Sequence, residues 1–297
     1  MRSAALRAVL PWALALFMSM PGPAAEPPAH VVVQPVVNLH GKPSAEAEVV
    51  SQALLGARLV ELERDGGWAR IKAEDDYLGW VPLSALRTLE GAERYPASLE
   101  AGKVVEVDAL AANIFAEPTV TRRAPLLTAP FGVRLERDPS PKDSKRWLQI
   151  RLPDRRSAWI QSGDVRTDLR PLSLDASLQL ARRFLGVNYT WGGTSSFGFD
   201  CSGFTQTIVR SRGVLMPRDA RVQAAWSGLV EVADRADLRP GDLLFFRETS
   251  PAISHTGIYL GEGRFIHDST SQRPCVQISE LAERGWSKAL VAMRRLK

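Results

Sequence analysis

The 297-residue sequence predicts two small all-β barrels followed by an α+β domain. Residues 30–168 are poor in helical periodicity and rich in short apolar runs, which is typical of short strands. The same region contains an internal repeat, which indicates two copies of one small unit. After residue 172, helical patterns come first and strand patterns follow, and this order favours an α+β domain.

The first residues have the layout of a secretory signal peptide. Arg2 and Arg7 give a basic start, an apolar run of about thirteen residues follows, and the small residues Gly22-Pro23-Ala24-Ala25 close the segment. The apolar run is short for a membrane span, and no cysteine follows it to carry a lipid. We therefore expect residues 1–25 to be removed and the mature protein to be exported without a stable membrane anchor.

The charge balance argues against nucleic acid as a partner. The formal net charge is +5, and it falls to +3 when the two arginines of the signal peptide are removed. A weakly basic protein is attracted to anionic polymers, but the chain has no basic run with interleaved aromatic residues. We expect no nucleic acid partner.

The internal repeat defines the two predicted barrels, residues 30–92 and 102–168. Its matched segments are Asn38-Leu39-x-x-x-Pro43 with Asn113-Ile114-x-x-x-Pro118, Trp68-Ala69-Arg70-Ile71 with Trp147-Leu148-Gln149-Ile150, and Gly79-Trp80-Val81-Pro82 with Ala158-Trp159-Ile160-Gln161. The offset grows along the repeat, which predicts an insertion at residues 139–145 of the second copy. We expect the Trp-x-x-Ile and Gly-Trp-Val segments, with most of their tryptophans, to fill a small core in each copy.

Residues 172–297 form the predicted α+β domain. Apolar residues at helical spacing predict a helix over 174–185, for which Ser173 and Asp175 are both candidate N-caps. A second helix is expected at 220–226, after the irregular stretch 216–219. Strands are expected at 243–247 and 290–294, because both are short apolar runs and a Pro-Gly-Asp turn precedes the first of them.

The most informative stretch is Tyr189–Thr207, which reads YTWGGTSSFGFDCSGFTQT. Its glycine-rich first half and helix-like second half place Cys201 where a loop enters a helix. The unpaired N–H groups and the positive dipole end of a helix favour a thiolate, which is a nucleophile. A lone cysteine is more often a small buried apolar residue, but the tight glycine loop and the adjacent aspartate argue against that role for Cys201. Cys275 lies in the polar stretch TSQRPCVQ, and we expect it to be a surface or half-buried thiol with no role in the site. We expect no disulfide between the two, because it would consume the nucleophile.

A thiolate nucleophile needs a base, and two histidines follow Cys201 in the same domain. His255 lies in SHTGIYLG and His267 lies in RFIHDS, and Gly261-Glu262-Gly263 between these segments predicts a hairpin. Adjacent strands would bring the two rings together, so that His255 takes the thiol proton and His267 orients His255. Neither the spacing of these histidines nor any acidic neighbour matches a zinc motif, and we expect no metal or other cofactor.

The sequence resembles the NlpC-type family of bacterial cell-wall cysteine peptidases. The matching segments are Tyr189-x-Trp191-Gly192-Gly193, Phe199-Asp200-Cys201-Ser202-Gly203, Pro217-Arg218-Asp219, Gln223, Pro240-Gly241-Asp242-Leu243, Ser254-His255-Thr256-Gly257-Ile258-Tyr259 and His267. The resemblance implies a papain-like fold for residues 172–297, with Cys201 as nucleophile, His255 as base and His267 as the third polar residue. It also implies that the repeats are bacterial SH3-like domains, which in this family bind the wall or shape the cleft.

The resemblance implies a substrate as well. The family cleaves peptidoglycan stem peptides, and the layout is most similar to the γ-D-glutamyl-L-diamino-acid endopeptidases. In that subgroup the first SH3-like domain closes one end of the cleft and leaves room for a short stem, so that stems with a free N-terminal L-alanine are preferred. Tyr189, Trp191, Asp200 and Ser202 are the expected substrate-binding residues, with Asp200 either pairing with the free ammonium group or capping the Cys201 helix. Ala220 stands where the subgroup often has a serine, which removes one expected hydroxyl contact.

Two alternatives remain open on the sequence alone. The protein could be a non-catalytic wall-binding protein, although the complete set of Cys201, His255 and His267 argues against this. It could also be an acyltransferase on the same fold. In every case the expected partner is peptidoglycan or its fragments, and the expected location is the periplasm or the extracellular cell wall.

Overall fold

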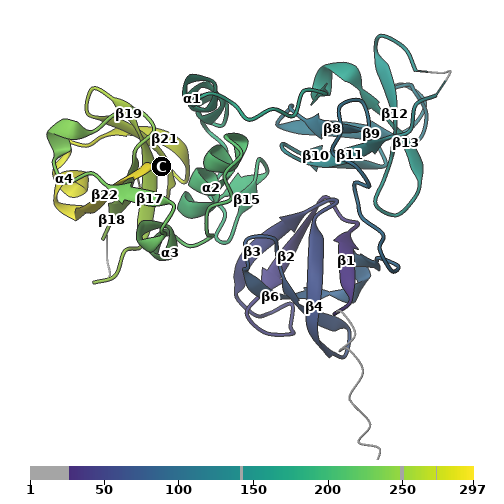
Figure 1. Ribbon diagram of the computed structural model, residues 1–297, viewed down its shortest axis with the longest axis horizontal. Coiled ribbons are helices and arrows are strands. Elements are labelled where there is room, and N and C mark those ends of the chain that lie inside the picture. The colour runs from purple at the N-terminus through teal and green to yellow at the C-terminus, as the bar shows by residue number, and fades with distance from the viewer. Residues whose placement is uncertain (1–26, 141–142, 248–250, 272) are drawn as a thin grey trace, which may run out of the picture.

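The structure is a computed structural model that describes residues 27–140, 143–247, 251–271 and 273–297. The predicted signal peptide, residues 1–25, lies outside the described residues. Figure 1 shows three packed units: two are built almost wholly from strands, and the C-terminal one combines helices with a sheet.

The N-terminal half forms two seven-stranded antiparallel sheets with the same strand order. The strands of the first are β1 (Ala29–Val32), β2 (Val36–His40), β3 (Val49–Leu54), β4 (Arg58–Asp65), β5 (Trp68–Lys72), β6 (Leu78–Pro82) and β7 (Leu86–Thr88). Those of the second are β8 (Val104–Val107), β9 (Ala111–Phe115), β10 (Leu127–Pro130), β11 (Arg134–Arg137), β12 (Trp147–Arg151), β13 (Ser157–Gln161) and β14 (Val165–Arg166). The orders, β3-β2-β6-β5-β4-β1-β7 and β10-β9-β13-β12-β11-β8-β14, confirm the internal repeat.

The predicted insertion lies between two equivalent strands. In the first sheet only Gly66 and Gly67 separate β4 from β5, whereas residues 138–146 separate β11 from β12 in the second. The extra residues therefore lengthen one hairpin loop and leave the strand order unchanged.

The core prediction was right for the aliphatic residues and wrong for the tryptophans of the first sheet. Ile71 and Val81 are fully buried in its core, but Trp68 and Trp80 are only half-buried. Successive residues of a strand point to opposite faces, so a tryptophan three residues before a core isoleucine must point away from that core. In the second sheet the two equivalent tryptophans are buried in a separate aromatic cluster with Phe115.

The C-terminal unit is built on a six-stranded antiparallel sheet of order β17-β22-β18-β19-β20-β21. Its strands are β17 (Leu229–Glu231), β18 (Leu243–Phe246), β19 (His255–Gly261), β20 (Arg264–Ser269), β21 (Cys275–Glu280) and β22 (Leu290–Leu296), and a small ribbon pairs β15 (Thr194–Ser195) with β16 (Gly198–Phe199). The helices are α1 (Leu174–Arg183), α2 (Cys201–Ser211), α3 (Ala220–Ala225) and α4 (Arg284–Ala289). Short 3₁₀ turns occur at Leu83–Ala85, Ser162–Asp164 and Arg235–Asp237.

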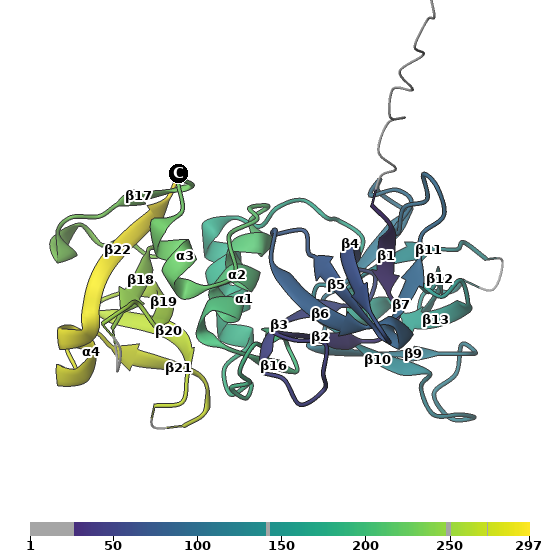
Figure 2. The same ribbon diagram turned by 90° about the horizontal axis from the view of Figure 1, so that it is seen from below.

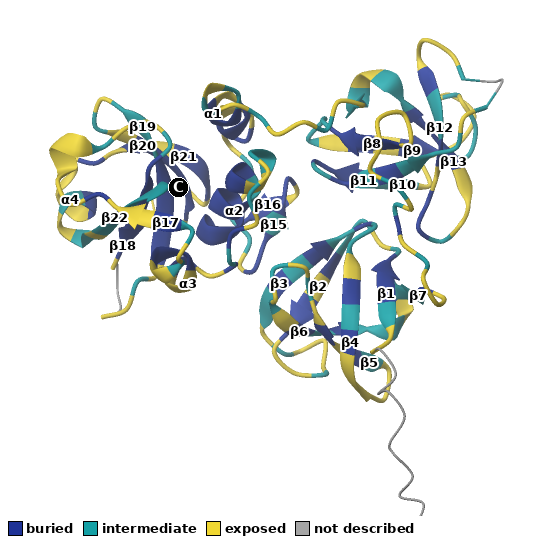
Figure 3. Ribbon diagram, in the orientation of Figure 1, coloured by how far each residue is buried: buried dark blue, intermediate teal, exposed yellow. Residues whose placement is uncertain are grey.

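Alternate residues of the central strands supply two apolar layers. Phe245 and Ile258 pack with α1 and α2, whereas Phe246 and Phe265 pack on the other face with Trp286 of α4. Figure 2 shows α1 and α2 between this sheet and the strands of the N-terminal half, and Figure 3 shows that the sheet itself is largely buried.

The predicted elements of this unit are confirmed with small changes at their ends. Ser173 is the N-cap of α1, because its hydroxyl accepts a hydrogen bond from the amide of Ala176. The helix ends at Arg183, two residues before the predicted end, and Gly186 follows in a left-handed conformation. The structure adds β21 and α4, which the sequence patterns had not predicted.

Candidate active site

Cys201 is the first residue of α2, as expected. The residue before it, Asp200, caps the helix, because its Oδ1 accepts a hydrogen bond of 2.8 Å from the amide of Gly203. The side chain of Cys201 is nearly buried, and its Sγ lies 3.9 Å from the carbonyl oxygen of Ser254. Ser254 immediately precedes His255, so the thiol and the first histidine strand meet at this point.

The two histidines lie together on the hairpin of β19 and β20. Nε2 of His255 is 2.8 Å from Nδ1 of His267, and Nε2 of His267 is 3.1 Å from Oγ of Ser279 on β21. Gly257 allows this close approach, because a Cβ there would lie 3.0 Å from the Cβ of His267. When His255 acts as a base, Nε2–H donates to His267, and Nδ1 is the nitrogen that takes a proton.

Both imidazoles are shielded from water. His255 stacks on Trp286 with ring centroids 5.2 Å apart, and His267 meets the edge of the same indole. Burial lowers the pKa of His255 to about 3, although the charge of Asp200 opposes this shift. Burial, and then the neighbouring His255, lower the pKa of His267 well below its usual value. The pair is therefore neutral at pH 7, which is the form a general base requires.

Of the expected substrate-binding residues, Asp200 and Ser202 are buried in a hydrogen-bond network. The carboxylate of Asp200 accepts hydrogen bonds from the amides of Gly192 and Gly203, from the hydroxyl of Ser202, and from both terminal nitrogens of Arg218. Five donors occupy the lone pairs that a carboxylate offers. Helix capping, the second of the two roles considered for Asp200, is therefore present in the structure.

The other two expected residues lie on the loop before α2. Trp191 is exposed, and its indole N–H donates to Oε1 of Glu48 at 3.1 Å. Tyr189 is half-buried, and its amide donates to the carbonyl of Pro274 at 2.8 Å. These residues lie on the same loop as Gly192, whose amide donates to the carboxylate of Asp200.

The N-terminal sheet supplies residues that sequence reasoning missed. The hydroxyl of Tyr77, between β5 and β6, donates to Oδ1 of Asp219 at 3.4 Å. Burial and the charge of Asp219 raise the pKa of Tyr77 to about 12, and burial raises the pKa of Asp219. Asp219 stood within the recognised motif, but no sequence signal marks Tyr77, because 142 residues separate it from its partner.

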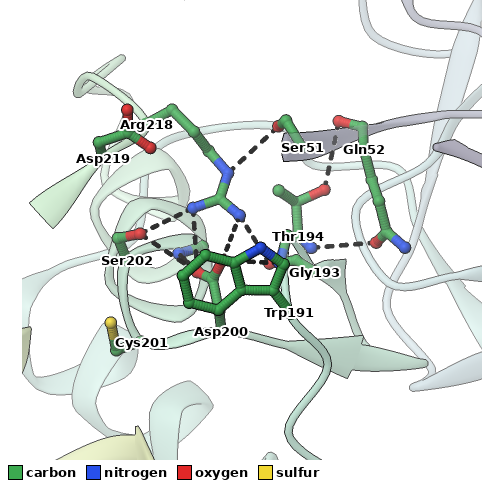
Figure 4. Close-up of polar contacts among 12 residues, drawn as sticks. Ser51, Gln52, Trp191, Gly193, Thr194, Asp200, Cys201, Ser202, Arg218 and Asp219 are labelled. Carbon is green, nitrogen blue, oxygen red and sulfur yellow. Dashed lines mark hydrogen bonds and ion pairs between the residues drawn. The ribbon is translucent and has the colours of Figure 1, made fainter. Parts of the chain in front are cut away.

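Figure 4 shows a second contact of the same sheet, in which Ser51 and Gln52 of β3 reach the residues around Cys201. Nε of Arg218 donates to Oγ of Ser51 at 3.2 Å, and the amide of Thr194 donates to Oε1 of Gln52 at 3.1 Å. Gly192 has a left-handed φ of +75°, and a Cβ there would lie 2.9 Å from Cγ1 of Val49. The loop before Cys201 therefore packs directly against β3.

Cys201 and Cys275 form no disulfide. The expectation of a surface or half-buried Cys275 was wrong: Cys275 begins β21, where it pairs with Ser269 of β20 and is buried. Within residues 27–140, 143–247, 251–271 and 273–297, no three histidine, cysteine, aspartate or glutamate side chains cluster as metal ligands would. In the same part of the chain, no helix has both the length and the apolar character needed to cross a membrane.

Comparison with known proteins extends this picture. Residues 186–295 match the model of the NlpC/P60 family, and residues 39–86 match the bacterial dipeptidyl-peptidase Sh3 domain. The chain is 29% identical over 261 residues to a gamma-D-glutamyl-L-lysine dipeptidyl-peptidase of Bacillus cereus, covering 82% of this chain and 74% of the relative. It is 42% identical over 120 residues to a Bacillus subtilis protein of the same name, but this covers only 40% of the chain and 39% of that relative.

A solved structure shares the fold over nearly the whole chain. The crystal structure of an NlpC/P60 family protein from Bacillus cereus superposes with a TM-score of 0.76 at 24% identity, covering 90% of this chain and 99% of that one. The match includes the N-terminal units as well as the C-terminal one. The C-terminal unit of this chain is an NlpC/P60 family peptidase domain, and a bacterial SH3 domain precedes it.

Proposed function

We propose that the protein is a cysteine endopeptidase that hydrolyses amide bonds in peptidoglycan stem peptides. The observation that carries the proposal is the hydrogen-bonded pair His255–His267, held beside a thiol at the start of a buried helix. The relatives named gamma-D-glutamyl-L-lysine dipeptidyl-peptidase support the substrate class. By this analogy, the bond cleaved joins γ-D-glutamate to the diamino acid that follows it.

The chemistry follows from the positions of these three side chains. Cys201 Sγ attacks the amide carbonyl while Nδ1 of His255 takes the thiol proton, and the backbone N–H of Cys201 stabilises the oxyanion. His255 returns the proton to the leaving amine, which leaves a thioester on Cys201. His255 then takes a proton from water, and the resulting attack releases the acid and the thiol. His267 keeps the ring of His255 in the required tautomer.

The first sheet supports a preference for peptides with a free N-terminal L-alanine. Asp200 already accepts five hydrogen bonds, so we propose that Asp219, rather than Asp200, pairs with the substrate ammonium group. Asp219 is exposed, so a substrate can reach it, and its pKa is raised, so a cation at this position would stabilise its charged form. Tyr77 orients the carboxylate, and Trp191 and Tyr189 line the approach to the thiol.

We also propose that residues 102–168 are a second SH3-like domain and that residues 172–297 have a papain-like arrangement. The shared strand order of the two N-terminal sheets supports the first assignment. Together with a signal peptide at residues 1–25, these assignments make the protein an exported enzyme that trims wall fragments. Mass spectrometry of the N-terminus of secreted protein checks the export step, and a chain that still begins at Met1 would contradict it.

The substrate proposal is tested with three synthetic peptides. L-Ala-γ-D-Glu-meso-diaminopimelate, the same peptide with L-lysine, and the first peptide with an acetylated N-terminus are incubated with mature protein, and the products are identified by mass spectrometry. We expect release of the diamino acid from the two free peptides and much slower release from the acetylated one. Equal rates with and without the acetyl group would contradict the preference, and cleavage elsewhere would contradict the assigned bond.

A further inference from the structure

One buried guanidinium holds the residues on both sides of the nucleophile. The side chain of Arg218 is 1% exposed. Its Nη1 donates to Oδ1 of Asp200 at 2.9 Å and to Oγ of Ser202 at 2.7 Å. Its Nη2 donates to Oδ2 of Asp200 at 2.6 Å and to the carbonyl of Gly193 at 3.3 Å. Cys201 lies between the two residues that this fork holds.

The network also fixes the backbone of the active site. Asp200 binds the amide of Gly192 at 3.1 Å in the preceding loop and the amide of Gly203 at 2.8 Å in the first turn of α2. Arg218 orients this carboxylate through two nitrogens. It therefore fixes the position of the backbone in the loop before Cys201 and in the first turn of α2. The position of Sγ relative to His255 depends on the same backbone.

The guanidinium is close enough to Cys201 for their charges to interact. A nearby cation favours the thiolate over the thiol. Since burial keeps both histidines neutral, Arg218 is a permanent positive charge beside a nucleophile that must become negative. Asp200 balances this charge, so its orientation relative to Arg218 affects the reactivity of the thiol.

The last donor of Arg218 reaches a different unit of the molecule. Nε donates to Oγ of Ser51 at 3.2 Å, across 167 residues of sequence, and Ser51 is buried on β3 of the first sheet. Figure 4 shows this bond on the opposite side of the guanidinium from Asp200 and Ser202. The first sheet therefore contacts the group that positions the nucleophile.

We propose that Arg218 is a positioning residue that fixes the backbone on both sides of Cys201, and that Ser51 of the first sheet holds Arg218 in that position. Docking of the first sheet is then coupled to the reactivity of the thiol as well as to the shape of the cleft. The inference rests on the proposed role of Cys201 as nucleophile, so it is tested on the thiol itself.

The experiment measures how fast iodoacetamide alkylates Cys201 between pH 5 and pH 9 in the full mature chain. Mass spectrometry of the tryptic peptide 184–210 follows Cys201 separately from Cys275. The variants are Arg218→Lys, which keeps the charge and loses the fork, and Ser51→Ala, which removes only the outer partner. Gln52→Ala is the matched control, because it weakens the same docking contact through Thr194 without touching Arg218. Peptide hydrolysis is measured in parallel as kcat and KM.

We expect Arg218→Lys to lower kcat by about tenfold or more, because a displaced nucleophile loses its alignment with His255. The alkylation rate at pH 6 should fall by a similar factor, because lysine cannot hold its charge and Asp200 in the same place, so less of the thiol is ionised. Ser51→Ala should lower both by about two- to tenfold, the effect of losing one hydrogen bond. Gln52→Ala should leave the pH profile of alkylation unchanged.

If Arg218→Lys does not fold, as judged by circular dichroism, the comparison of Ser51→Ala with Gln52→Ala decides alone. Identical alkylation profiles for these two variants would overturn the proposal. Hydrolysis that survives complete alkylation of Cys201 would overturn the nucleophile assignment instead.

Discussion

The two N-terminal sheets share one strand order but make different contacts with the rest of the chain. The turn between β5 and β6 and the turn between β12 and β13 are equivalent, and each has one residue with a left-handed φ, Asp76 at 63° and Arg155 at 71°. In the first turn, Asp75 accepts a hydrogen bond of 2.8 Å from Gln206 of α2, and Tyr77 reaches Asp219. In the second turn, Arg155 instead pairs with Glu93 of the first unit.

The edge strands show the same divergence. Asn38 lies opposite Gln52 in the first sheet, and Asn113 lies opposite Thr128 in the second, so the register is equivalent. The counterpart of Ser51 is therefore Leu127, which has no polar group to offer an arginine. The shared backbone provides the scaffold, and a few side chains determine which copy contacts the active site.

The second sheet contacts the peptidase domain away from the thiol. The ring of Phe131 meets the edge of Phe184 with centroids 5.3 Å apart, and the amide of Phe131 donates to Oγ of Ser196 at 2.9 Å. Arg183 at the end of α1 pairs with Asp108. The second sheet therefore packs against α1 and the β15–β16 ribbon, whereas the first sheet contacts the residues next to Cys201.

The largest losses of activity are expected from the β19–β20 hairpin, where we propose that His255 is the base, and the variants of the two sheets are compared with these losses. We expect His255→Ala to lower kcat/KM more than a thousandfold, because it removes the base, and His267→Ala to cost about ten- to a hundredfold. Steady-state assays on the free tripeptide check this. Equal and small losses for both variants would mean that the base lies elsewhere.

Two glycine variants distinguish the effect of disturbing the contact with β3 from the effect of straining the backbone. Gly192 and Gly132 have similar left-handed angles of +75° and +82°, but only Gly192 faces β3, whereas a Cβ at Gly132 would meet nothing within 4 Å. Gly192→Ala should lower kcat/KM by about tenfold, because the loop before Cys201 must move. Gly132→Ala should reduce thermal stability alone, by about 1 kcal/mol. Similar activity losses for both variants would contradict the claim that only the first sheet affects the residues around Cys201.

The equivalent turn residues give a smaller effect. Tyr77→Phe removes the hydroxyl that orients Asp219, and we expect KM for the free tripeptide to rise about three- to tenfold. Arg156→Ala, at the counterpart position of the second turn, should leave KM unchanged, since the only ion pair of Arg156 within the described residues is with Asp154 of its own turn. A rise in KM for Arg156→Ala would show that the second sheet also contributes to substrate binding.

Replacement of Asp268 should have the smallest effect on activity. It should instead change the free energy of unfolding. Asp268 is fully buried, and among the described residues neither carboxyl oxygen has a hydrogen-bond partner of good geometry. Burial, and then the charge of Asp200, raise its pKa from 3.8 to about 8, although the nearby amide of Ser269 opposes this shift. Ionisation therefore favours the unfolded state increasingly as the pH rises from about 4 to about 8. Asp268→Asn should be more stable than the parent by about 1–3 kcal/mol at pH 8 and equal to it near pH 4. Urea unfolding at both pH values measures this, and a pH-independent difference would contradict it.

Local patterns in the sequence predicted much of the fold and part of the site. The repeat predicted two equivalent sheets, the glycine-rich loop predicted a helix beginning near Cys201, and Gly261-Glu262-Gly263 predicted the hairpin that brings His255 to His267. These features depend on residues close together in the chain, where spacing and turn chemistry decide the structure.

The remaining parts of the site depend on contacts between distant segments. Ser279 supports His267 from β21, and Ser51 supports Arg218 from another unit. The spacing of apolar and polar residues along the chain does not predict contacts between such distant residues. Asp200 shows the same limit, because the sequence allowed either a helix cap or an ammonium partner and gave no sign that five donors converge on its carboxylate.

The central claim is that Cys201 forms a covalent intermediate with the N-terminal part of the stem peptide. The direct measurement mixes mature protein with L-Ala-γ-D-Glu-meso-diaminopimelate, quenches with acid, and examines the tryptic peptide 184–210 by mass spectrometry. We expect the mass of an L-Ala-γ-D-Glu acyl group on Cys201, no adduct and no hydrolysis with Cys201→Ala, and a normal adduct with Cys275→Ser. Hydrolysis by Cys201→Ala at a rate comparable with the parent, or an acyl group on another residue, would contradict the claim.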